Sequence, residues 1–127
     1  MYSITEKEEF ITIQFLPEKT IYEKGLDDLR NDIISMCRKT GKMRILIYAN
    51  LTESKLSPIQ LFNNAEKLKE SNMAGIKIAV VGSAFNKTPE SRFNENVNQN
   101  RGIMLNYFED EQQAIGWLKE GLLNDKE

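Results

Sequence analysis

The chain has 127 residues, of which 40% are hydrophobic and 28% charged, and its net charge is -2. This size and balance predict one globular domain over residues 1–127, and they exclude the broad positive surface that nucleic-acid binding requires. The sequence has no histidine and a single cysteine, which excludes Ser-His and Cys-His nucleophile chemistry and argues against a zinc site.

The first residues predict a β-hairpin. YSIT (residues 2–5) and FITIQFL (residues 10–16) are separated by the charged stretch EKEE (residues 6–9). The second run alternates β-branched or aromatic side chains with Thr12 and Gln14, which is typical of a half-buried strand. An N-terminal hairpin that ends before Pro17 is therefore expected.

A long helix is predicted over residues 25–41. Its apolar side chains recur at spacings of three and four residues, as on one face of a helix, at Leu26, Leu29, Ile33 and Cys37. Gly41 is expected to end the helix. Cys37 lies on the apolar stripe, so it is interpreted as a small buried hydrophobe, with a reactive thiol as the alternative.

The next pair of elements is a buried strand over residues 44–51 and a helix over residues 57–71. The strand is a continuous apolar run, which predicts burial on both faces of a sheet. The helix begins with Ser57, Pro58 and Gln60, a capping-box pattern. The side chains expected to face the sheet are Leu61, Phe62, Ala65 and Leu68.

A second buried strand is predicted over residues 76–82, followed by a helix with Thr88 as its cap and Pro89 behind it. Because Phe93 and Val97 are its only apolar pair, this helix is expected to be short, exposed and poorly anchored.

The last predicted elements are a strand over residues 103–108 and a helix over residues 110–123, capped by Asp110. The side chains expected to point inward from this helix are Ala114, Trp117, Leu118 and Leu122. The order of elements predicts an α/β fold: an N-terminal β-hairpin leads into a mixed, partly parallel central sheet covered by about four helices.

The turn at residues 82–88 invites comparison with a phosphate-binding loop. Such a loop needs Gly, four free residues, Gly, Lys and then Ser or Thr. Here Lys87 stands where the second glycine is required, and Thr88 follows directly. The stretch is therefore interpreted as a structural turn.

Two strand-to-helix loops, residues 49–58 and 82–89, are expected to meet at the carboxyl ends of parallel strands, where ligands bind in α/β sheets. Their candidate ligand or partner residues, together with Phe93 on the helix that follows, are Thr52, Ser54, Ser57, Ser83, Phe85, Lys87, Thr88 and Phe93. The free N–H groups of the two helix starts would suit an anion. The alternative is that the hydroxyls only cap helices or face solvent.

Two charged clusters have structural interpretations as well. The acidic residues 109–111 begin the last helix, where carboxylates cap N–H groups, and they are too few for a calcium or magnesium site. The basic cluster comprises Arg38, Lys39, Lys42 and Arg44. It is expected to solvate a helix end, with an anionic partner as the alternative.

The apolar runs ILIYA and IAVV are far too short to cross a bilayer, so no transmembrane segment is expected. The opening residues MYSITEKEEF lack the features of a signal peptide. A cytoplasmic protein is expected. No cofactor is expected, and no catalytic motif is complete, although carboxylate, lysine or tyrosine chemistry remains open.

KIAVVGSAFNKTPESRFNENV followed by MLNYFEDEQQAIGWL resembles the closing half of bacterial SpoIIAA-like proteins of the STAS superfamily. Phe108, Asp110, Ala114, Trp117 and Leu118 fit the closing pattern of these proteins. The hairpin, the first helix and the strand MRILIYANLTE fit the same plan, so the resemblance covers nearly the whole chain.

The resemblance implies a non-catalytic regulatory or protein-interaction module. It also implies a phosphorylated serine before a helix, but the Asp-Ser-Ser or Asp-Ser-Thr motif is missing here, and Ser54 and Ser57 are the nearest candidate phosphosites. The interaction surface would be helix 89–101 with the two loops, and self-association through the edge of the hairpin is an alternative.

A second hypothesis is a carrier or sensor of a small apolar or lipid-like ligand, by analogy with CRAL-TRIO domains. Its pocket is predicted near Tyr48, Phe85 and Phe93. The identity of any partner or ligand does not follow from the sequence.

Overall fold

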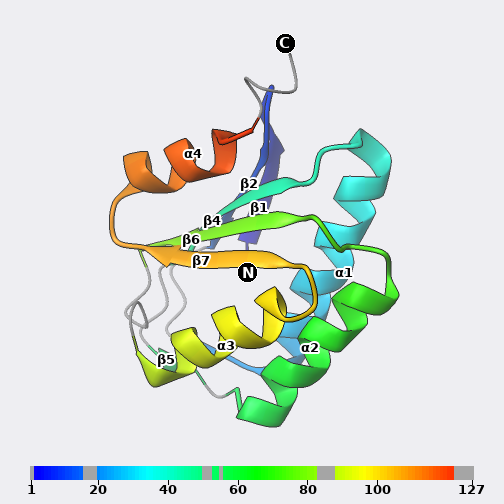
Figure 1. Cartoon of the computed structure of the whole chain (residues 1–127), viewed down its shortest axis with the longest axis vertical. Helices are drawn as coiled ribbons and strands as arrows, with labels where there is room; N and C mark the ends of the chain where they lie inside the picture. Colours follow the sequence, from blue (N-terminus) through cyan, green and yellow to red (C-terminus); the bar gives the residue numbers. More distant parts are fainter. Residues whose placement is uncertain (1, 16–19, 50–52, 55, 83–87, 122–127) are drawn as a thin grey trace.

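The computed structural model describes residues 2–15, 20–49, 53–54, 56–82 and 88–121. Within them, a five-stranded sheet forms the centre of the molecule, in the strand order β1-β2-β4-β6-β7 (Figure 1). Its strands are β1 (Tyr2–Glu6), β2 (Ile11–Phe15), β4 (Arg44–Tyr48), β6 (Lys77–Val81) and β7 (Met104–Phe108). The predicted mixed α/β fold is confirmed.

β1 and β2 form the predicted hairpin. They pair antiparallel, from Tyr2 opposite Phe15 to Glu6 opposite Ile11. The N–H of Lys7 donates to a carbonyl three residues on, at 2.8 Å, which closes the turn. The other pairs of this sheet are parallel, so the hairpin supplies its antiparallel edge.

The central strands β4 and β6 are covered on both faces. All five residues of β6 are buried, and so are Ile45, Leu46 and Ile47 of β4. Successive side chains of a strand point to opposite faces, so each of these strands contributes to two cores. This confirms the interpretation of both apolar runs as doubly covered strands.

Helices lie on both faces of the sheet (Figure 1). α1 (Glu23–Thr40), α2 (Pro58–Glu70) and α3 (Pro89–Gln99) cover one face, and α4 (Glu111–Lys119) covers the other. The larger core lies under the first three helices and includes Ile33, Cys37, Ile47, Leu68 and Ile78. The smaller core lies under α4 and includes Leu46, Ala79, Ala114 and Leu118.

Capping contacts confirm the predicted starts of α2, α3 and α4 and the predicted end of α1. α1 begins two residues earlier than predicted, at Glu23, and α4 ends at Lys119, while Leu122 of the predicted last helix lies outside the described residues. At α2, Ser57 Oγ accepts from the N–H of Gln60 at 3.3 Å, and Gln60 Oε1 accepts from the N–H of Ser57 at 2.8 Å. Thr88 and Asp110 cap α3 and α4 in the same way, each with its side-chain oxygen. Gly41 ends α1 with φ at 75°, in the left-handed region that glycine enters without a Cβ penalty.

Phe62 of α2 does not face the sheet as predicted. Leu61, Ala65 and Leu68 are buried at spacings of four and three residues. Phe62 follows Leu61 by about 100° around the helix, which turns its ring away from that stripe. Its side chain is 37% exposed, so the expectation that it faces the sheet is wrong.

The expectation that α3 is poorly anchored is also wrong, because polar groups anchor it. Ser91 and Asn98 are buried, and their side chains donate to carbonyls of α3 or its cap at 2.9 and 2.8 Å. Glu95 Oε2 accepts from the backbone N–H of Tyr107 on β7 at 2.9 Å. The Ser91 and Asn98 bonds lie within the helix and its cap, whereas the Glu95 bond ties α3 to β7 without a wide apolar stripe.

Two short strands were not predicted. β3 (Thr20–Ile21) and β5 (Glu53–Ser54) pair in parallel as a separate two-stranded sheet. Two residues are too few to show a periodic pattern, so the sequence carries no signal for them. Within the described ranges, no helix combines the length and the apolar character needed to cross a bilayer.

Candidate functional site

The two predicted loops begin side by side at one edge of the sheet. β4 and β6 are parallel neighbours, and the N–H of Ala49 donates to the carbonyl of Val81 at 2.9 Å just beyond their ends. The strands that lead into the two loops therefore end side by side, and the expectation that the loops meet stays a prediction, because residues 50–52, 55 and 83–87 lie outside the described part of the chain. The candidate residues that lie outside the described part of the chain are Thr52, Ser83, Phe85 and Lys87, and the side chain of Ser54 lies outside it as well.

Ser57 and Thr88, the described hydroxyls of these loops, act as helix caps. Ser57 Oγ accepts at the start of α2, and Thr88 Oγ1 accepts from the N–H of Ser91 at 3.1 Å at the start of α3. Each oxygen satisfies one of the N–H groups that a helix start leaves free. The structural interpretation accounts for both residues, and their ligand or partner role remains a prediction.

Exposed apolar side chains gather on α2 and α3, which lie next to each other (Figure 1). Ile59 is 61% exposed, Phe62 37% and Phe93 36%. Phe93, Val97 and Arg101 recur every four residues, so they follow one side of α3 and its last turn. Arg101, in the turn that follows α3, contacts α2, so the two helices that carry these apolar side chains are joined at this end.

Arg101 joins the two helices. Its guanidinium lies over the ring of Phe62, 4.3 Å from the ring centre, and its Nε donates to Glu66 Oε1 at 2.5 Å. Its Nη1 also donates to the carbonyl of Val97 at 2.7 Å. The guanidinium covers one face of the Phe62 ring, and the side chain remains partly open to solvent. We name the surface made by Ile59, Phe62, Phe93 and Arg101 the α2–α3 face.

Beneath α3 lies a polar contact with the edge strand β7. Asn94 Nδ2 donates to the hydroxyl of Tyr107 at 3.0 Å. The pKa of Tyr107 is raised to about 12, mainly by burial; the hydrogen bond from Asn94 lowers this pKa, and the carboxylates of Glu90 and Glu95 raise it. The hydroxyl therefore keeps its proton at neutral pH and acts as a structural hydrogen-bonding group.

The pocket predicted near Tyr48, Phe85 and Phe93 does not form from the residues that the structure describes. Tyr48 packs with the smaller core under α4, and its hydroxyl donates to Glu111 Oε1 at 2.6 Å. Phe93 belongs to α3 on the opposite face of the sheet. Phe85 lies outside the described residues. The sheet therefore separates Tyr48 from Phe93.

The remaining sequence candidates serve structural roles. Cys37 is 3% exposed, and burial raises the pKa of its thiol, which disfavours the reactive thiolate. Asp110 accepts from the N–H groups of Gln112 and Gln113, as expected of a cap. Among the described residues, no group of three or more acidic or cysteine side chains could hold a metal ion.

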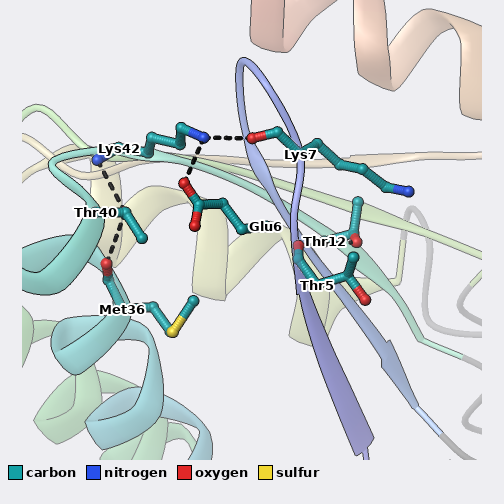
Figure 2. A network of polar contacts seen from close by, with 7 residues as sticks. All are labelled: Thr5, Glu6, Lys7, Thr12, Met36, Thr40 and Lys42. Carbon is teal, nitrogen blue, oxygen red and sulfur yellow. Dashed lines mark hydrogen bonds and ion pairs between the residues drawn. The ribbon is translucent and has the colours of Figure 1, made fainter.

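Three cations of the basic cluster bind the chain itself, and the first of them, Arg38, donates from Nη2 to the carbonyl of Ser71 at 3.3 Å. Figure 2 shows Lys42 between the end of α1 and the hairpin turn. Its Nζ donates to Glu6 Oε2 at 2.7 Å and to the carbonyl of Lys7. Arg44 Nε donates to the carbonyl of Leu118 at 2.7 Å, so it ties β4 to α4. These contacts favour the structural interpretation over an anionic partner.

Sequence reasoning missed the exposure of Ile59 and Phe62 and the role of Arg101. The sequence does carry a signal for the exposure of Ile59 and Phe62, because neither residue lies on the side of the helix that carries residues 61, 65 and 68. A large apolar side chain off the buried stripe of a helix is a candidate contact for a partner. The stacking of Arg101 depends on the approach of two helices and has no local signal.

No family model matches the chain, and no curated protein matches it either. Solved structures are similar to the chain in their fold. The anti-sigma factor antagonist SpoIIAA in its unphosphorylated form is similar with a TM-score of 0.57 and 13% identity, over 94% of this chain and 99% of that one. The phosphorylated form of the Bacillus cell fate determinant SpoIIAA has a TM-score of 0.51 and 12% identity, over 93% and 99%.

These SpoIIAA structures belong to STAS-domain proteins, so the resemblance expected from the sequence is confirmed for the fold. At such identities the likeness concerns the fold alone. What the chain does has to be argued from its own surfaces.

Proposed function

We propose that residues 1–127 form a single, non-catalytic regulatory domain of STAS type that binds a protein partner through the α2–α3 face. The observation that carries this proposal is the exposure of Ile59, Phe62 and Phe93 on two adjacent helices. Large apolar and aromatic side chains that remain exposed next to an arginine are typical of the anchors of protein interfaces. The anti-sigma factor antagonist activity in the name of the similar SpoIIAA structure suggests an anti-sigma factor as the class of partner.

The helices that carry the α2–α3 face are firmly held. α3 is fixed by its polar contacts with β7, and Arg101 fixes it to α2. A surface that is already ordered loses little conformational entropy when a partner binds. We therefore expect the α2–α3 face to bind as a preformed surface.

The chemistry of the described side chains supports a non-catalytic role. The thiol of Cys37 is buried and free, which also fits the reducing cytoplasm that we propose as the location. Burial lowers the pKa of Lys77, but its Nζ donates to the carbonyl of Trp117 at 2.6 Å and lies over the ring of Trp117. A lysine held in this way has no access to a substrate.

Ser54 and Ser57 remain the proposed phosphosites. Ser57 precedes Ile59 by two residues, so a phosphate on Ser57 would place two negative charges beside the α2–α3 face. It would also lie at the positive end of the α2 dipole, where a phosphate is stabilising. Phosphorylation would then alter partner binding without unfolding α2. Intact-mass analysis of protein purified from its own host detects the modification, and peptide mapping assigns it.

The experiment that tests the proposal is affinity capture from the host with tagged protein. The double variant Ile59→Glu and Phe93→Glu is compared with the wild type. Tyr22→Ser is the control, because Tyr22 is an aromatic residue at the start of α1 that is 60% exposed, at least as exposed as Phe93. Loss of a central anchor typically costs about 2 kcal/mol, or about thirtyfold in affinity. We expect an anti-sigma factor to be enriched by the wild type and the control and lost with the double variant. Equal enrichment by all three proteins would contradict the proposal.

A further inference from the structure

An apolar cavity of about 120 Å³ lies between the sheet and helices α1, α2 and α3. Its walls include Ile47 and Ile78 from the central strands, Leu29 and Ile33 from α1, and Leu61 from α2. An engineered apolar cavity of about 150 Å³ binds benzene, so this one has room for the hydrocarbon part of a ligand of about six carbon atoms.

Two charged side chains line this cavity, Arg30 from α1 and Glu90 from α3. Arg30 of α1 is 8% exposed and lines the cavity wall. Its Nη1 donates to Asp27 Oδ1 at 2.7 Å and to Asn64 Oδ1 at 3.0 Å. Nε and Nη2 donate no hydrogen bond to any residue that the structure describes. Buried N–H groups without an acceptor are costly, so these donors are available to an acceptor that enters the cavity.

The same arginine also borders the surface. Leu26, Arg30 and Asn64 line a second, smaller depression of about 50 Å³ between α1 and α2. These three side chains therefore separate the apolar cavity from an opening that is polar and includes Gln60 and Lys67. A ligand that enters between α1 and α2 would place its apolar end in the cavity and its polar end beside Arg30.

We propose that this cavity binds a small carboxylic acid with a hydrocarbon part of about six carbon atoms, its carboxylate on Arg30 and its hydrocarbon among the leucine and isoleucine side chains. A guanidinium offers two parallel N–H donors to a carboxylate, and this geometry favours a carboxylate over an alcohol of the same length. Glu90 lines the cavity from α3, so the ligand carboxylate is held at the α1 side, away from that negative charge.

The site is distinct from the α2–α3 face, and the inference does not rest on the proposed function. Phe93, Phe62 and Ile59 do not line the cavity. The double variant Ile59→Glu and Phe93→Glu is therefore expected to bind the acid as well as the wild type does. Failure of partner binding and failure of ligand binding can be told apart.

The test is a titration of the full chain with hexanoate, 1-hexanol or hexylamine. Binding is monitored through the backbone amide chemical shifts in NMR spectra. Hexanoate is expected to bind most tightly and to shift the amides of α1 and α2 around Arg30. Hexylammonium is expected not to bind, because it would face the guanidinium. No saturable shift with hexanoate, or binding of all three compounds with equal affinity, would overturn the proposal.

Two variants separate the acid site from non-specific binding. Ala49→Leu adds three carbon atoms to a buried side chain in the cavity wall, so it should abolish hexanoate binding while the protein remains folded. Arg30→Lys removes the two parallel N–H donors of the guanidinium and should weaken hexanoate binding at least about tenfold. Arg38→Lys, on the exposed side of the same helix, is the matched control. Unchanged hexanoate affinity in Ala49→Leu would overturn the proposal even if Arg30→Lys fails to fold.

Discussion

The hydroxyl of Tyr107 gives a quantitative prediction about stability at alkaline pH. Its pKa is about 12 in the folded protein and about 10 in an unfolded chain. Because the folded pKa is raised, the stabilisation is fully present below pH 10 and is lost as the pH rises toward 12. For this pair of pKa values, the loss in the free energy of unfolding is about 1.4 kcal/mol at about pH 11 and approaches about 2.7 kcal/mol at still higher pH.

The perturbation that isolates this effect is Tyr107→Phe. At about pH 8 the variant loses the hydrogen bond from Asn94 Nδ2, which costs about 1 kcal/mol. At about pH 11 the wild type has lost about 1.4 kcal/mol through ionisation and the variant has not, so the difference between them should disappear or reverse slightly. Other groups that titrate in this range, including Tyr48, contribute equally to both proteins and cancel.

The assay is urea unfolding of both proteins at the two pH values, with circular dichroism of the helices as the signal. The difference in unfolding free energy between wild type and Tyr107→Phe is compared at each pH. A difference that stays constant from about pH 8 to about pH 11 would refute the reasoning, because it would mean that Tyr107 has the same pKa in both states.

Two further predictions concern the elements that frame the sites. Ser57→Ala removes one half of the capping box of α2 and should lower the free energy of unfolding by about 1 kcal/mol in urea titrations, whereas Ser35→Ala on the exposed side of α1 should change it little. Leu118→Ala removes a fully buried side chain from the smaller core and should cost about 2–5 kcal/mol; a loss below about 1 kcal/mol would mean that α4 does not cover the sheet as described.

The parts of the fold that could be predicted are those with local causes. The hairpin follows from a charged turn between two alternating runs, and the starts of α2, α3 and α4 follow from Ser57, Thr88 and Asp110. Each cap is a hydrogen bond within three residues of sequence. Such contacts are the same in any fold that keeps the helix, so the sequence alone specifies them.

The parts that could not be predicted depend on how elements meet. The anchoring of α3 comes from a hydrogen bond between Glu95 and the backbone of β7, and no spacing rule connects those residues. The cavity arises where helices and sheet fail to fill the space between them. One trace of it is visible in the sequence, because Arg30 falls beside Leu29 on the inward side of α1, where a cation needs buried partners.

The candidate site was predicted only in outline. The strands that lead into the two loops end side by side, and Ser57 and Thr88 lie at the helix starts as expected. The α2–α3 face does not follow from the sequence prediction, which places Phe62 against the sheet, whereas Phe62 is exposed. Its exposure follows from the helical phase of Leu61, Ala65 and Leu68, which the structure fixes.

The measurement that most directly tests the proposed regulatory role is photo-crosslinking in the host. A benzophenone amino acid replaces Phe93 on the α2–α3 face in one protein and Tyr22 on α1 in the other, and mass spectrometry identifies the attached proteins. We predict that the probe at position 93 crosslinks an anti-sigma factor and that the probe at position 22 does not. The same adduct from both positions, or an anti-sigma factor attached at position 22 alone, would contradict this prediction.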